Sequence, residues 1–126
     1  MPSPAECRFL ESHEWHKIDG NVVTIGISKF AVDELTDITF VELPSVDDEF
    51  AAGDELGEVE SVKTTSEIYT GVGGKIVAVN EELENNPGLI NEDPFGNGWL
   101  VKIETQSPED LDALLDATGY DQQFDA

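Results

Sequence analysis

The chain has 126 residues, of which 39% are hydrophobic, and its 28 acidic and six basic side chains give a formal net charge of −22. This length and composition suit one folded domain with a modest core rather than a disordered chain. The charge argues against a nucleic-acid-binding protein and against one that adsorbs to an anionic membrane, because both surfaces would repel the chain.

The excess of acid admits two interpretations. It would steer a partner with a basic face toward the chain, at a rate that falls as salt is added. It would equally well serve solubility or adaptation to a salty cytoplasm, so the charge alone does not imply a basic partner.

The chain carries no sign of secretion or membrane insertion. Cys7 is the only cysteine, so an internal disulfide is impossible and a reducing compartment is expected. Residues 1–12 lack the basic start and apolar run of a secretory signal and the Arg-rich character of a transit peptide. No apolar run approaches the roughly 18 residues of a membrane helix. We therefore expect a cytoplasmic protein, or a mitochondrial matrix protein if a transit peptide has been removed.

The first part of the chain predicts strands around a short helix. Residues 1–8 hold two prolines and little pattern, which is typical of a loose tail. β-Branched residues predict a strand at 21–28, and a second strand at 37–44 is ended by its proline. Ser28 is a candidate N-cap of a short helix between them. The apolar face of that helix is formed by Phe30, Ala31 and Leu35.

Short strands and glycine turns fill the middle of the chain. Residues 46–62 predict short strands broken at their two glycines, and residues 68–80 predict a strand, a glycine turn and a second strand. Residues 81–98 read as a turn-rich connection with one helical turn near its start, and residues 99–104 alternate as a strand.

The clearest helix signal lies at residues 107–120. Ser107 is a candidate N-cap, Pro108 suits the first helical position, and Gly119 is a candidate stop. One apolar face would be formed by Leu111, Leu114, Leu115 and Thr118. Together these elements predict a mainly β fold with a C-terminal amphipathic helix, in a single domain over residues 1–126.

A metal or catalytic site finds little support in the sequence. His13 and His16 are the only histidines, and together with Cys7 they do not make a structural zinc set. The chain lacks EF-hand spacing, a G-x-S-x-G nucleophile motif and a phosphate-binding loop; the glycines at 71–74 indicate a turn instead. We therefore expect neither metal ligands nor catalytic residues.

Lys63 stands out within the stretch ESVKTTSE, residues 60–67. Its flanks can pair as strands, which would place Lys63 at or near a hairpin tip. The neighbouring side chains are small, namely Ser61, Thr64, Thr65 and Ser66. A lysine on a long flexible stem can anchor a covalent group through an amide bond. The simpler alternative is an unmodified, solvated charge.

The same octapeptide resembles the lipoylation motif of the H-protein family of the glycine cleavage system. Further matches occur in the family's order at SHEW (12–15), VTIGIS (23–28), VELP (41–44), VNEEL (79–83), NEDPFGNGWL (91–100) and SPEDLDALLDA (107–117). The resemblance covers almost the entire chain, from about Arg8 to Tyr120.

The resemblance implies a lipoyl/biotinyl-type barrel-sandwich hybrid of two antiparallel sheets, with lipoate in amide linkage on Lys63. It also implies a carrier rather than an enzyme. In the family, a glycine decarboxylase (P protein) loads an aminomethyl group, and a tetrahydrofolate-dependent aminomethyltransferase (T protein) takes the carbon. Dihydrolipoamide dehydrogenase (L protein) reoxidises the dithiol, and a lipoate-attaching enzyme is also implied.

The family further implies a cleft that receives the loaded arm. Ser12, Glu14 and Glu67 match positions that line it, and a carboxylate is a natural partner for the cationic amine of the cargo. The alternative for these three residues is an ordinary solvated surface.

The chain departs from the family pattern in three places, and some rival functions stay open. Thr64 stands where alanine is frequent, Glu67 where aspartate is common, and residues 70–74 replace a Ser-Pro-x-x-Gly turn. A biotinyl domain is disfavoured because Lys63 has no methionine neighbours, and a 2-oxoacid dehydrogenase lipoyl domain would lack SHEW and the C-terminal helix. An H-like protein that relays lipoate or sulfur, and an unmodified acidic interaction module, remain alternatives.

Overall fold

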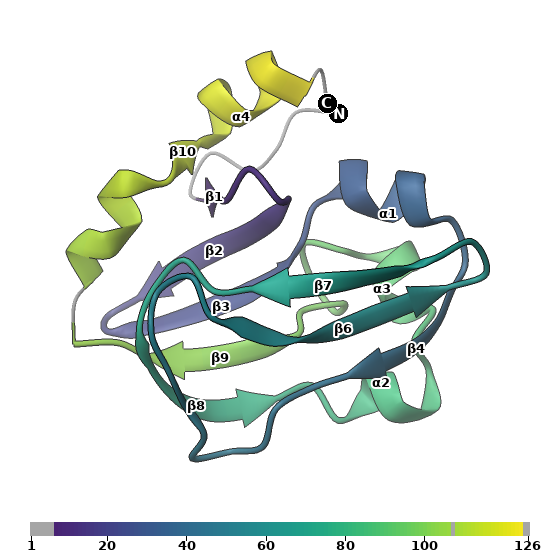
Figure 1. The fold of residues 1–126 in the computed structure, drawn as a ribbon, viewed down its shortest axis with the longest axis horizontal. Helices are drawn as coiled ribbons and strands as arrows, with labels where there is room; N and C mark the ends of the chain where they lie inside the picture. The colour runs from purple at the N-terminus through teal and green to yellow at the C-terminus, as the bar shows by residue number, and fades with distance from the viewer. Residues whose placement is uncertain (1–6, 107, 125–126) are drawn as a thin grey trace.

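The computed structural model describes residues 7–106 and 108–124, and over these residues the chain is mainly β. Its described strands form two antiparallel sheets (Figure 1). The larger sheet runs, in spatial order, through β10 (Leu115–Asp116), β1 (Arg8–Phe9), β2 (Glu14–Asp19), β3 (Val22–Ile27), β9 (Val101–Glu104), β8 (Gly74–Val79) and β5 (Glu49–Phe50). The smaller sheet runs through β4 (Ile38–Glu42), β6 (Glu55–Ser61) and β7 (Thr65–Tyr69). The expectation of two antiparallel sheets is confirmed.

The short helices lie in the connections between strands. Ser28 caps α1 (Lys29–Leu35) as predicted, because its Oγ accepts a hydrogen bond from the Ala31 N–H at 3.3 Å. The helical turn expected after residue 80 is α2 (Glu82–Asn85), and a second turn that was not predicted, α3 (Leu89–Glu92), follows it. Among the described residues, every helix is too short or too polar to cross a bilayer.

The sequence predicts a strand break at Gly57, but in the structure Gly57 lies inside β6. The β6–β7 pairing shifts register between Glu55 and Gly57, so the glycine marks an irregularity rather than an end. A Cβ at Gly57 would lie 2.0 Å from the Glu42 carbonyl oxygen of β4. The glycine is therefore needed because two backbones approach closely, which a local pattern does not reveal.

The single helix predicted at residues 107–120 is wrong in detail. Ser107 falls outside the described residues, and a 3₁₀ helix (Pro108–Ala113), the two-residue strand β10 and α4 (Ala117–Phe124) follow it. The interruption has a tertiary cause, since β10 pairs with β1 along the outer side of that strand. Gly119 is not a stop; its N–H donates to Asp116 Oδ1 at 2.7 Å at the start of α4, as in an N-cap.

The loose N-terminal tail predicted at 1–8 does not include Arg8. Arg8 lies in β1, where it pairs with His16 of β2 on one side and with Asp116 of β10 on the other. The residues before Cys7 are outside the described range.

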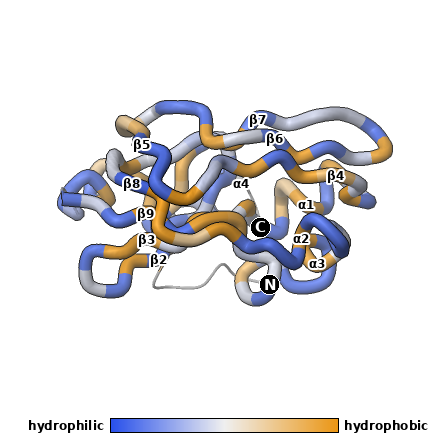
Figure 2. Tube along the Cα trace, turned by 90° about the horizontal axis from the view of Figure 1, so that it is seen from below, coloured by the Kyte–Doolittle hydropathy of each residue, from blue (hydrophilic) through white to orange (hydrophobic). Residues whose placement is uncertain are grey.

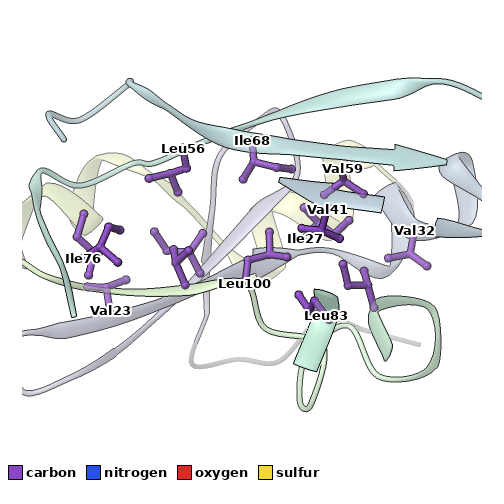
Figure 3. Close-up of a cluster of buried hydrophobic side chains, with 14 of the residues drawn as sticks. Val23, Ile27, Val32, Val41, Leu56, Val59, Ile68, Ile76, Leu83 and Leu100 are labelled. Atoms are coloured by element: carbon purple, nitrogen blue, oxygen red, sulfur yellow. The ribbon is translucent and has the colours of Figure 1, made fainter. Parts of the chain in front are cut away.

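The main core lies between the two sheets. Figure 2 shows the strands of the smaller sheet above those of the larger one, and Figure 3 shows their side chains meeting. The labelled contributors from the smaller sheet are Val41, Leu56, Val59 and Ile68, and those from the other elements are Val23, Ile27, Val32, Ile76, Leu83 and Leu100. Burial of these side chains is the main force that holds the sheets face to face.

A second, smaller core joins the two ends of the described chain. It is formed by Cys7, Phe9, Trp15, Ala117 and Tyr120, with Phe95, Trp99 and Leu115 packed against it. In Figure 1 the segment with β10 and α4 lies beside β1, with which β10 pairs. The C-terminal segment thus covers aromatic residues of the first strands.

Candidate functional site

Lys63 lies in the turn between β6 and β7, as the sequence predicts. Ser61 organises this turn: its N–H donates to the Thr64 carbonyl oxygen at 2.8 Å. Its Oγ accepts hydrogen bonds from the N–H groups of Lys63 and Thr64, both at 3.1 Å. Because the Ser61 side chain is buried, the turn is held from within while the Lys63 side chain is exposed.

The turn is also tied to the neighbouring loop. The Val62 N–H donates to the Asp37 carbonyl oxygen, between α1 and β4, at 3.1 Å. Within the described part of the chain, the Lys63 amine makes no hydrogen bond or ion pair. A flexible stem with a free amine on a fixed backbone is well suited to covalent attachment.

Glu14 begins β2 and is fully buried. Its Oε1 accepts a hydrogen bond from Ser12 Oγ at 2.5 Å, and its Oε2 accepts one from the Tyr69 N–H at 2.7 Å. Burial raises the pKa of Glu14 to about 7, although both hydrogen bonds oppose the change. A nearby cation would stabilise the charged form of this carboxyl.

Tyr69 connects Glu14 to Glu67. Its backbone N–H binds Glu14, and its phenol donates to Glu67 Oε2, which is exposed. The hydrogen bond to Glu67 is the main reason that the pKa of Tyr69 is raised. The structure therefore brings Ser12, Glu14 and Glu67 into one hydrogen-bonded group around the end of β7.

A cavity of about 320 Å³ lies between α1 and the β7 hairpin strand. It is lined by Ser12, His13, Ile27, Phe30, Ala31, Glu34, Leu35, Ser66 and Ile68. Of the three predicted residues, Ser12 lines the cavity, whereas Glu14 and Glu67 are not among its lining residues. A cavity with apolar walls and a few polar groups can exclude water from a narrow, mainly apolar ligand that ends in a polar group.

The sequence does not predict some of the residues that line this cavity. For His13 the one local indication is its place between Ser12 and Glu14 in SHEW. Phe30 and Glu34 come from α1, and the packing of that helix brings them to the cavity. The sequence marks Phe30 as part of the apolar helix face, but no local pattern places either residue at a cavity.

The second histidine does not line the cavity. His16 is fully buried, and its Nε2 accepts a hydrogen bond from the Gly71 N–H at 2.9 Å. Desolvation lowers the pKa of His16 to about 4, so the ring is neutral near pH 7 and carries its proton on Nδ1. Over residues 7–106 and 108–124, no three side chains of metal-binding type gather into a site.

Comparisons with known proteins point in one direction. The family model described as Glycine cleavage H-protein matches residues 7–126. The glycine cleavage system H proteins of Staphylococcus haemolyticus and Staphylococcus epidermidis (strain RP62A) are each 52% identical to this chain over 124 residues, 98% of both chains. The crystal structure of a glycine cleavage system H protein from Mycobacterium marinum is similar at a TM-score of 0.89 and 36% identity, covering 98% of this chain and all of that one.

Proposed function

The chain belongs to the glycine cleavage H-protein family, and from this premise we propose that Lys63 is the residue that carries its lipoyl group. Members of the family are non-catalytic lipoyl carriers with lipoate on a lysine, so this protein is a carrier and not an enzyme. The expected lipoyl-type fold is confirmed by the similarity to the solved H protein.

The turn at Lys63 is the observation that best supports this assignment. Ser61 fixes the backbone of the turn, and the Lys63 side chain extends from it into solvent. The neighbours Thr64 and Thr65 are small, so an attaching enzyme can reach the amine. Lipoate, when bound, supplies a dithiolane that accepts the aminomethyl group of the cargo.

We propose that the cavity beside β7 receives the loaded arm. Ile27, Phe30 and Ile68 of its lining would exclude water. Ser12 lies at the cavity and holds Glu14 Oε1 through its hydroxyl. A cationic amine forms a stronger hydrogen bond to a carboxylate than a hydroxyl does, so the amine would compete with Ser12 for Glu14. Glu67 would offer a second carboxylate from the exposed side.

Membership of the glycine cleavage system implies enzyme partners in general. We propose that they are the P protein (glycine decarboxylase), the T protein (aminomethyltransferase), the L protein (dihydrolipoamide dehydrogenase) and a lipoate-attaching enzyme. We also propose that residues 1–126 act as one domain in the cytoplasm; the bacterial relatives and the extent of the family match support this.

Incubation with a lipoate–protein ligase and lipoate tests the attachment site. We expect one lipoyl adduct by intact mass, mapped to Lys63 and absent from Lys17, Lys29, Lys75 and Lys102. The control is Lys63→Arg, which keeps the charge but cannot form the amide, and should show no adduct. An adduct on Lys63→Arg, or none on the natural chain under conditions that modify a known carrier, would overturn the assignment.

A second assay separates glycine cleavage from relay of lipoate or sulfur to other enzymes. The lipoylated protein is mixed with P protein, glycine and labelled bicarbonate, and exchange of the label into glycine is measured. Exchange supports the shuttle in glycine cleavage, while its absence from a fully lipoylated sample would favour the relay.

A further inference from the structure

The hydroxyl of Tyr120 lies between two side chains from distant parts of the chain. Tyr120 belongs to α4 and is fully buried, and its Oη is 2.7 Å from His13 Nδ1 and 2.6 Å from Ser28 Oγ. Both distances are those of good hydrogen bonds. Because the hydroxyl has a single proton, at least one of its two partners must donate to it.

One of the two partners lines the cavity, and the other caps a helix that lines it. His13 lines it directly, and Ser28 caps α1, the helix that supplies Phe30 and Glu34 to the lining. The Ser28 N–H also donates to the His13 carbonyl oxygen at 2.9 Å. The loop before β2 and the start of α1 are thus joined twice, once by backbone and once through Tyr120.

The contact between His13 and the Tyr120 hydroxyl matters because the backbone of His13 has an unfavourable conformation. Its φ is 85°, a conformation that residues with a Cβ seldom adopt, so tertiary contacts must hold it. Its ring lies against Phe30, with 4.8 Å between the ring centroids. A shift of the His13 ring would therefore move the Phe30 side of the cavity as well.

The ring of Tyr120 is held independently of its hydroxyl. It stacks on Phe9 with 4.3 Å between centroids and 13° between planes, inside the smaller core. Desolvation by burial, the larger influence, raises the pKa of Tyr120, so the hydroxyl keeps its proton through the neutral range. Packing of the ring holds α4 in place, and the hydroxyl is free of that task and makes the hydrogen bonds to His13 and Ser28.

We infer that Tyr120 is a positioning residue of the cavity. Its hydroxyl joins His13 to Ser28 and so fixes two walls of the cavity relative to each other. The inference rests on the proposed role of the cavity in receiving the loaded arm. The C-terminal helix contributes no residue to the lining, yet it shapes the site through this one hydroxyl. No property of Tyr120 itself in the sequence indicates this.

The test compares Tyr120→Phe with Phe9→Leu. Tyr120→Phe removes the hydroxyl and keeps the stacked ring, whereas Phe9→Leu loosens the same core and keeps the hydroxyl. The first readout is the ¹⁵N chemical shift of His13 Nδ1 in the unlipoylated protein at fixed pH. We expect a larger movement in Tyr120→Phe than in Phe9→Leu, even though Phe9→Leu lowers the unfolding midpoint more.

The second readout is the lifetime of the loaded arm in buffer. Tyr120→Phe should shorten it by about three- to tenfold, which is the range expected for the loss of one hydrogen bond. An unmoved His13 signal, or a moved signal with an unchanged lifetime, would overturn the positioning role. If the natural protein itself does not protect the arm, the proposed function of the cavity fails and the positioning role falls with it. Failure of the positioning role alone gives a different result, because the natural protein then protects the arm while the His13 signal or the lifetime is unchanged in Tyr120→Phe.

Discussion

The carboxyl group of Glu14 is buried, and burial destabilises its charged form. The free energy of unfolding must therefore depend on pH. In the unfolded chain the group would titrate near 4.5, whereas in the folded chain its pKa is about 7. Between these values the folded form binds more protons, so stability falls as pH rises through this window. The penalty is absent well below pH 4.5 and complete above pH 7, where it is roughly 3 kcal/mol.

Glu14→Gln imitates the protonated acid and should remove this penalty. We expect the variant to be more stable than the natural protein by about 1–3 kcal/mol at pH 8, with a much smaller difference at pH 5. Urea unfolding at both pH values measures the two differences. An equal or larger gain at pH 5 would contradict the sign of the effect.

The same variant also tests the proposed contact with the cargo. Glu14→Gln should still be lipoylated at Lys63, because the Glu14 side chain is buried away from the turn surface. The loaded arm should nevertheless decay severalfold faster at pH 8, since a charged partner for its amine has been lost. Glu67→Gln is the matched comparison, because it makes the same substitution at the exposed carboxylate. An unchanged lifetime of the loaded arm in Glu14→Gln would remove Glu14 from this role.

At the scale of elements, the close approach of β4 and β6 depends on Gly57. A Cβ there would collide with the Glu42 carbonyl oxygen, so Gly57→Ala must push the two strands apart. We expect a loss of about 1–3 kcal/mol in the free energy of unfolding, as for other overpacked sites. Gly88→Ala is the control, because a Cβ at Gly88 meets nothing closer than 3.5 Å. Equal stability of the two variants would refute the close approach.

The elements that could be predicted are those whose signals are local. β3 follows from its β-branched residues and α1 from its Ser28 cap, because side chains within each segment determine both. The break between the 3₁₀ helix and α4 could not be predicted, since it depends on pairing with β1 more than a hundred residues earlier in the chain.

The same distinction holds for the site. Lys63 is recognisable as a candidate anchor because a hairpin is a local structure with small residues around the lysine, whereas its lipoyl group follows only from the family resemblance. Ser12, Glu14 and Glu67 were identified only through the family resemblance, and their connection through Tyr69 depends on how β2 and β7 pack. Phe30 gave a helix-face signal, yet its place at the cavity is a property of the tertiary structure.

At the scale of the whole molecule, acidic side chains far outnumber the available cations. The ion pairs of the described residues include Lys29 with Asp33 at 3.1 Å and Lys75 with Asp47 at 3.5 Å, all exposed. On the smaller sheet, desolvation and then the neighbouring carboxylates raise the pKa of Glu55. Self-repulsion of this kind destabilises the folded state and is screened by salt.

Salt should therefore stabilise the protein. We expect the thermal midpoint to rise as NaCl is increased from about 0.05 M to about 1 M, where the screening length falls to roughly 3 Å. Glu55→Gln should raise the midpoint at low salt and lose that advantage at high salt. Scanning calorimetry of both proteins measures this, and a midpoint that stays flat or falls with NaCl would show that repulsion is not the controlling effect.

The pairing of β1 with β10 has a consequence for how the protein is made. A ribosome completes the Lys63 hairpin early, but β1 receives its outer partner only after residues 115–116 have left the exit tunnel. Until then Phe9 and Trp15 lack their cover of Ala117 and Tyr120. An unfinished chain thus displays aromatic residues that a finished one hides, which gives chaperones and proteases a means of telling a truncated carrier from a complete one.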